Sequence, residues 1–255
     1  MAEGINIPVP AGYTRAMPFD RGKHRGLGVA EHAAGFAHRL HAIYLTSIEI
    51  PRAALDCPVV FARDAAKQII PVFLLGVEPQ QNLFCDERGN WPHEFYIPAY
   101  VRRYPFFLAR IAQQDQRGII CVDDTALTKG GEQLIDERGE PTAVWEERQK
   151  LIQQLDTESE RTREFCAKLE ALGILETFDA DFHPELKASQ AAALKPARIN
   201  GLMRVGRKSL AALDDATLGD LVRNNWMQPI EAHLNSLARF DRLLNRFAIA
   251  AQRID

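Results

Sequence analysis

The adjacent Arg102 and Arg103 are the residues whose type and setting most clearly suggest chemistry. They lie in the segment 91–107, where seven of seventeen residues are aromatic in a chain that is 8% aromatic overall. A planar guanidinium group binds carboxylates through paired hydrogen bonds and stacks on aromatic rings. Two interpretations stay open. One is an internal ion pair with Glu49; the other is an anion or carboxylate clamp beside aromatic side chains, namely Trp91, Tyr100 and Tyr104.

The two arginines are expected to have different roles, because successive side chains point in different directions on a strand or a helix. We expect one to be buried or half-buried and paired with a carboxylate such as Glu49. The other is expected to face a cleft or the surface beside Tyr104. An enzyme with an uncommon site built from Glu49, Arg102 and Tyr104 is the alternative.

Other polar clusters favour structural roles. Asp123 and Asp124 follow an apolar run, but adjacent aspartates on a strand face opposite ways, so one is expected to cap the next turn. Histidines at 32, 38 and 41 lead into a predicted strand, where their side chains do not converge, so no metal site is predicted. The sequence contains no GxSxG, GxxxxGK[ST] or GxGxxG pattern, and no cofactor is predicted.

Composition limits the partners and the compartment. The net charge of −3 and pI of about 6.2 disfavour nucleic-acid binding. No window approaches 18 uncharged apolar residues, so membrane insertion is not expected. The first ten residues do not form a secretory signal, which predicts a cytoplasmic protein. The four scattered cysteines, with no CxxC, predict buried thiols rather than disulfides or a zinc site.

The pattern of elements predicts an α+β fold with a mixed or antiparallel β-rich body, one long helix and a C-terminal helical segment. Residues 1–30 are expected to form an extended arm, and 31–255 a single domain that is β-rich over 40–140. Strands are predicted at 43–50, 59–61, 72–75, 106–111 and 118–122, with a short helical turn from Pro51. The repeated tetrapeptide at 86–89 and 136–139 predicts two hairpin tips.

From Thr142 the apolar spacing changes to three and four residues, which predicts a helix over 142–172 that ends at Gly173. Glu158 and Thr162 interrupt its apolar stripe, so its middle is expected to be solvated or to contact a polar surface. Over 174–250 we expect strands at 174–178 and 199–205 and then helices, one capped by Asp214 or Asp215 and the last opened by Pro229. Residues 188–197 fit either a helix or a loop.

Several motifs resemble those of the bacterial SapC-like family. The central one is YIPAYVRRYPF at 96–106; DCPVVF at 56–61, PVFLLG at 71–76, NLFCD at 82–86 and AHLNSL at 232–237 resemble others. The similarity extends from about Leu40 to the end of the chain.

The resemblance implies a soluble, non-enzymatic accessory or binding protein, linked to nutrient uptake or to modification of peptides or sugars. The expected partner is a protein or a small anionic ligand, and assembly into a homo-oligomer is left open. A surface-layer-associated structural protein is the third alternative.

Overall fold

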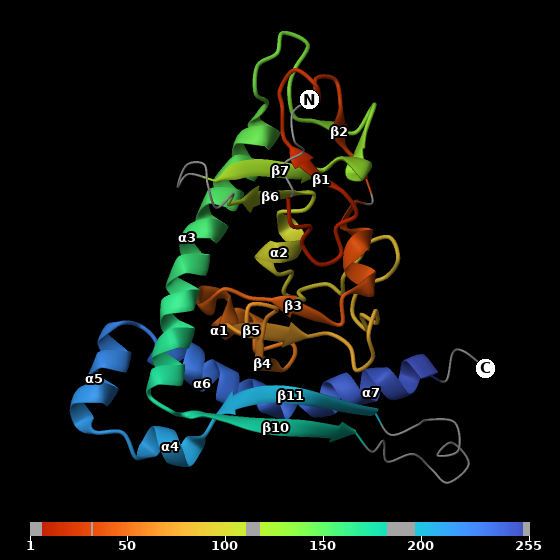
Figure 1. The fold of residues 1–255 in the computed structure, drawn as a ribbon. Helices are drawn as coiled ribbons and strands as arrows, with labels where there is room; N and C mark the ends of the chain where they lie inside the picture. The colour runs from red at the N-terminus through yellow and green to blue at the C-terminus, as the bar shows by residue number, and fades with distance from the viewer. Residues whose placement is uncertain (1–6, 32, 111–117, 183–196, 252–255) are drawn as a thin grey trace. The chain divides into compact units, whose positions relative to one another are not determined.

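The computed structural model describes residues 7–31, 33–110, 118–182 and 197–251. It confirms the predicted α+β class, with antiparallel sheets, one long helix and a helical C-terminal segment (Figure 1). The chain divides into two compact units. Unit 1 comprises residues 1–38, 85–90 and 99–157, and unit 2 comprises 39–84, 91–98 and 158–255.

Unit 1 contains two small antiparallel sheets. The first has the order β1 (Ala16–Pro18), β7 (Ile119–Asp123), β6 (Phe106–Ala109), and the second β8 (Leu127–Thr128), β2 (Gly28–Val29), β9 (Glu132–Gln133). The predicted arm over 1–30 thus supplies one strand to each sheet. The short helical segments of this unit are η1 (Ala33–Arg39), which runs on to the first residue of unit 2, α2 (Ala99–Arg102), which precedes β6, and η3 (Asp124–Ala126), which joins β7 to β8.

The core of unit 1 is aromatic where β6 meets α3 (Ala143–Ala171). Phe106 is fully buried, and its ring lies 5.2 Å from that of Trp145 in an edge-to-face contact. Phe19, from the N-terminal arm, stacks on Trp145 with 4.1 Å between ring centroids. Such contacts stabilise beyond the area that they bury, and they hold the arm on the unit.

Unit 2 is built on a five-stranded antiparallel sheet. Its order is β10 (Leu175–Phe182), β11 (Ala197–Val205), β4 (Val59–Arg63), β5 (Ile69–Leu74), β3 (Ala42–Tyr44), with β10 and β11 side by side as a long pair (Figure 1). The helical segments are η2 (Ser47–Glu49), α1 (Ile50–Ala53), α4 (Arg207–Ala211), α5 (Asp215–Arg223), α6 (Met227–Ser236), η4 (Leu237–Arg239) and α7 (Phe240–Ala251).

A histidine side chain completes the seam between β4 and β11. The one backbone pair found there within the described ranges joins Met203 to Phe61, and the same register places Val205 opposite Val59. The imidazole of His233 lies between these two valines. It accepts a hydrogen bond from the Val205 amide at 3.1 Å, and its Nδ1 donates to the Val59 carbonyl at 2.7 Å.

Ser236, one helical turn further along α6, accepts a 2.9 Å hydrogen bond from the Val59 amide. Both residues belong to the segment 232–237. Buried backbone N–H and C=O groups need hydrogen-bond partners. The side chains of His233 and Ser236 provide them for the Val59 amide and carbonyl and for the Val205 amide.

The long helix α3 agrees with its prediction. It begins after Thr142, whose Oγ1 accepts from the Trp145 amide at 3.3 Å, and it is followed by Gly173 at a φ of 63°. Its polar middle is not solvated at Thr162, which is 1% exposed. The Thr162 hydroxyl accepts a 2.7 Å hydrogen bond from the Ser47 amide, so the stripe contacts a polar turn, the second of the two expected outcomes.

The strand predicted over 43–50 is wrong beyond Tyr44, where β3 ends. The Glu49 carboxylate accepts hydrogen bonds from the Thr46 amide at 2.9 Å and from the Thr46 hydroxyl at 2.7 Å. Such local side-chain bonds favour a helical turn over a strand, and they outweigh the β-propensity of the segment. The turn predicted from Pro51 is confirmed as α1, with proline in its first turn.

Two other expectations need correction. The last helix is interrupted by η4, so α6 and α7 are separate, and Pro229 lies in α6 two residues after its start. The Asp86–Gly89 segment is a turn without flanking strands.

Strand β10 extends to Phe182, and β11 begins at Ala197. Of the alanine-rich segment 188–197, all but the last residue lies outside the described residues.

The two DERG tetrapeptides nevertheless have the same geometry. In each, the glycine has a positive φ, 84° at Gly89 and 89° at Gly139, and its amide donates to the carbonyl of the aspartate that opens the tetrapeptide, three positions back. In each, the aspartate Oδ1 also accepts from the amides two and four residues ahead. The repeat therefore reflects shared turn chemistry.

All four cysteines are free and buried. Burial raises the pKa of their thiols, to about 11 for Cys121 and about 12 for Cys166. Among the helices of the described ranges, none is long and apolar enough to cross a membrane.

Candidate functional site

The arginine pair lies at the end of α2 in unit 1. The Arg103 amide bonds to the Ala99 carbonyl at 2.9 Å, which continues the helical turn through the pair. Arg102 is exposed and Arg103 is half-buried, so the two differ as the sequence predicts. Glu49 belongs to unit 2, and the predicted ion pair between it and an arginine stays a prediction.

Arg103 is held by aromatic rings. Its guanidinium carbon lies 4.7 Å from the ring centroid of Tyr100 and 6.0 Å from that of Tyr13. Its Nε is buried without a hydrogen-bond acceptor, and within the described residues no carboxylate forms an ion pair with it. The side chain is therefore positioned by cation–π contact rather than by an internal salt bridge.

Tyr13, from the arm predicted over residues 1–30, is at the centre of this cluster. Its ring makes edge-to-face contacts with Phe36, Tyr100, Tyr104 and Phe107, and its hydroxyl donates to the Phe106 carbonyl at 3.1 Å. Burial raises the pKa of Tyr13, and the positive charge of Arg103 opposes part of that rise. Tyr13 therefore remains a neutral hydrogen-bond donor near neutral pH. No local sequence signal distinguishes it from the rest of the arm.

Tyr100 and Tyr104 are both buried. Tyr100 donates from its hydroxyl to the Ala11 carbonyl at 2.8 Å, which links α2 to the N-terminal arm. Tyr104 stacks on Phe36, with ring centroids 4.0 Å apart. Burial and the neighbouring Asp123 raise the pKa of Tyr104, so it too stays protonated.

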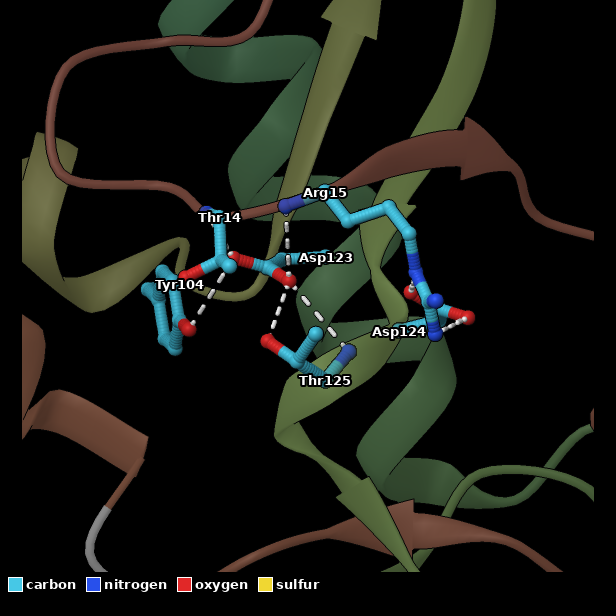
Figure 2. Close-up of polar contacts among 6 residues, drawn as sticks. All are labelled: Thr14, Arg15, Tyr104, Asp123, Asp124 and Thr125. Carbon is cyan, nitrogen blue, oxygen red and sulfur yellow. Dashed lines mark hydrogen bonds and ion pairs between the residues drawn. The ribbon is translucent and has the colours of Figure 1, made fainter.

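Asp123 is a fully buried carboxylate with five hydrogen-bond donors around it (Figure 2). The amides of Thr14, Arg15 and Thr125 donate at 2.6, 3.3 and 3.2 Å, and the hydroxyls of Thr125 and Tyr104 at 2.6 and 3.3 Å. Because its acceptor capacity is occupied and water does not reach it, Asp123 is suited to anchoring the arm rather than to transferring protons.

Asp124 points away from Asp123 and forms a two-pronged ion pair with the exposed Arg15, at 2.5 and 2.7 Å (Figure 2). The two aspartates do not form a dyad, and Asp123 caps the turn η3, as predicted. Together they hold the same stretch of the arm: Asp123 accepts from the backbone amides of Thr14 and Arg15, and Asp124 binds the side chain of Arg15.

The remaining candidate residues, Trp91 and Glu49, lie in unit 2. Trp91 stacks on Phe95, with centroids 5.4 Å apart, and its buried Nε1 has no hydrogen-bond partner among the residues that the structure describes. Glu49 accepts hydrogen bonds from Thr46, as described, and from the Tyr96 hydroxyl at 2.8 Å. Any site that joins these residues to Arg102, Arg103 or Tyr104 draws on both units and stays a prediction.

The sequence missed a second arginine–aromatic stack in unit 2. Phe95 also stacks on Phe84, and the guanidinium of Arg246 lies 4.4 Å from the Phe84 ring centroid. Arg246 also donates to the Leu83 carbonyl at 3.0 Å, and burial lowers its pKa. Arg246 lies 163 positions after Leu83, so only the fold brings the two segments together.

The histidine candidates are separated. His32 lies outside the described residues. His38 is in unit 1, where its Nδ1 is 2.8 Å from the Cys85 carbonyl, and His41 is in unit 2. Over the part of the chain that the structure describes, no three His, Cys, Asp or Glu side chains converge in a way that would hold a metal ion.

Comparison with known proteins gives one match. A family model described as SapC matches residues 19–243, a span that includes α2, α3 and every named strand except β1. No curated protein matches the chain, and no solved structure does.

Proposed function

Because the chain belongs to the SapC family, we propose that it is a non-enzymatic binding protein whose Arg103 contacts an anionic group, carboxylate or phosphate, on a ligand or partner. Arg102 is the second, exposed contact. The family resemblance supports the accompanying role, that of a cytoplasmic accessory factor for nutrient uptake or for modification of peptides or sugars.

The observation that carries this proposal is the state of Arg103. Its guanidinium is half-buried against Tyr100 and Tyr13, and no carboxylate among the described residues balances its charge. Burying an unpaired charge is costly. An anion from outside would offset that cost and would find a guanidinium whose orientation is already fixed, which lowers the entropy lost on binding.

A third arginine strengthens the local positive charge. Arg148, on α3, donates from Nη1 to the Arg102 carbonyl at 2.8 Å, so it lies beside the pair. Its Nη2 is 3.5 Å from the exposed carboxylate of Glu132, which balances this third charge only in part. Clustered guanidinium groups attract and orient oxyanions, whereas the chain as a whole carries a net charge of −3.

The test uses nitrogen-15 NMR of the arginine side chains. The Arg103 Nε–H is buried and so should exchange slowly with water, which makes its signal observable; Arg103→Lys identifies it. We expect that signal to shift and saturate during titration with succinate or with inorganic phosphate. Arg102→Lys should keep the shift of the Arg103 signal, with weaker affinity.

The proposal is wrong if the Arg103 signal stays fixed with both anions while the protein remains folded. A shift that is the same for chloride as for succinate would also contradict it, because simple screening of charge would then explain the effect.

A further inference from the structure

Unit 2 contains a pocket of about 620 Å³ that no part of the proposed function uses. Its walls come from three stretches of the sequence: 47–51 in η2 and α1, 158–164 in the second half of α3, and 223–229 from the end of α5 to the start of α6. The volume falls in the range of ligand-binding cavities in proteins.

The pocket contains an aliphatic side chain that the fold does not bury. Ile48 is 66% exposed, although the residues on both sides of it, Ser47 and Glu49, are buried. Pro229 and a partly exposed Trp226 also line the pocket. The Trp226 ring also packs against the buried Phe165 in a tilted contact, with 6.3 Å between ring centroids. The pocket therefore offers an apolar surface.

Two carboxamides line the same pocket with their polar groups unused. Among the described residues, the side chains of Asn225 and Gln228 have no hydrogen-bond partner. The position of Asn225 is fixed by the end of α5. It has a φ of 58°, its amide bonds to the Val222 carbonyl at 3.0 Å, and the Trp226 amide bonds to the Leu221 carbonyl at 2.8 Å. This pattern is a Schellman motif with asparagine in the left-handed position.

The charges around the pocket largely cancel. Its lining includes two arginines and two glutamates. Arg161 pairs with Glu158 at 2.7 Å, both of them lining residues, and Arg223 pairs with Asp220 at 2.8 Å. A strongly charged ligand would have to compete with these pairs, whereas a neutral one would not.

We propose that this pocket binds a neutral, extended peptide segment, with an apolar side chain against Ile48 and Trp226 and a backbone amide against Asn225 and Gln228. A carboxamide presents one acceptor and two donors, which matches the N–H and C=O of a peptide bond. A saccharide would also satisfy the amides, but its C–H faces would bury less apolar area against Ile48 and Trp226 than an aliphatic side chain does. The peptide is thus the ligand class that uses both surfaces. This proposal is independent of the anion contact at Arg103, which lies in unit 1.

The test titrates isotope-labelled protein with three probes: the capped peptide acetyl-Gly-Leu-Gly-amide, the same peptide with glycine in place of leucine, and glucose. We expect the Trp226 indole N–H and the side-chain amide signals of Asn225 and Gln228 to shift with the leucine peptide. The triglycine peptide should bind about 10-fold more weakly, since it has no side chain to bury.

Two matched variants locate the contact. Ile48→Asp should lower the affinity for the leucine peptide by about 10-fold or more. Leu55→Asp changes another exposed apolar residue in the same stretch of chain, outside the pocket lining, and should leave the affinity unchanged. The proposal is overturned if none of the three signals moves with the leucine peptide, if glucose moves them more strongly, or if the two variants have equal effects.

Discussion

Val59 and Val205 face each other across the seam between β4 and β11, and the ring of His233 joins them in place of a direct backbone hydrogen bond. The arrangement determines the tautomer. A carbonyl can only accept, so Nδ1 carries the proton, and Nε2 is left as the acceptor for the Val205 amide. If Nε2 were protonated, its N–H would face the N–H of Val205, and two donors cannot form a hydrogen bond with each other. Burial lowers the pKa of His233 to about 4 from an ordinary value of 6.5, and the bond to Val59 only partly offsets this effect.

The first prediction concerns pH. With its folded-state pKa below its unfolded-state value, His233 binds more protons in the unfolded chain between about pH 6.5 and pH 4. Its contribution to stability is therefore fully present above pH 6.5 and is lost as the pH falls through this window, on the order of 3 kcal/mol in all. Urea titrations at pH 7.5, 5.5 and 4.5 would measure this. His233→Gln should be less stable at pH 7.5 and should lose less stability on acidification; equal losses in the two proteins would contradict the assignment.

The second prediction compares two adjacent aspartates. Asp123→Asn keeps the side-chain volume but sets an amide group against the donors that surround Asp123. We expect it to lower the free energy of unfolding by about 3 kcal/mol or more. Asp124→Asn disrupts only the exposed pair with Arg15 and should cost about 0–1 kcal/mol. Denaturant titrations of the two variants provide the comparison, and a similar loss in both would show that Asp123 is not the anchor of the arm.

The third prediction tests the core role of Tyr100, which is 9% exposed. Tyr100→Ala should destabilise the protein by about 3–5 kcal/mol, as large-to-small changes in a core do. Tyr100→Phe keeps the ring and loses only the hydroxyl bond to Ala11, and it should cost about 1 kcal/mol. The midpoint of chemical denaturation distinguishes the two, provided that the slope is unchanged. A cost below about 1 kcal/mol for the alanine variant would place Tyr100 outside the core.

The fourth prediction compares how much Arg102 and Arg103 each contribute to the stability of the fold. Arg103→Ala removes a half-buried side chain from two tyrosine rings and should cost about 1–2 kcal/mol. Arg102→Ala changes an exposed side chain and should cost about 0–1 kcal/mol. Thermal unfolding at one fixed pH and salt concentration compares them. If Arg102→Ala were the more destabilising change, the assignment of Arg103 as the held residue would be reversed.

The parts of the fold that follow from local chemistry could be predicted from the sequence. Helix α3 depends on apolar spacing, a threonine before it and a glycine after it, all within one segment. The DERG turns are specified by four residues each. The same holds for the differing exposure of Arg102 and Arg103, because it follows from the directions of successive side chains.

The remaining features depend on partners that are distant in the sequence. Tyr13 lies in a segment with no periodic pattern, and its role comes from Tyr100 and Tyr104, which are 87 and 91 positions away. Glu49 appeared to end a strand, because propensity does not include its bonds to Thr46. Asn225 has no local sequence signal of a binding role, because that role depends on Ile48, which comes from a turn far earlier in the chain.

The bond from His233 to Val59 also has a consequence for the order in which the chain is made. Translation proceeds from the N-terminus, so β4 leaves the ribosome 174 residues before the imidazole that it needs. Until then, the Val59 carbonyl and amide must remain hydrated or find temporary partners. The sheet of unit 2 can therefore be completed only late in synthesis, and the nascent chain exposes an unsatisfied strand edge for most of that time, the kind of surface that chaperones shield.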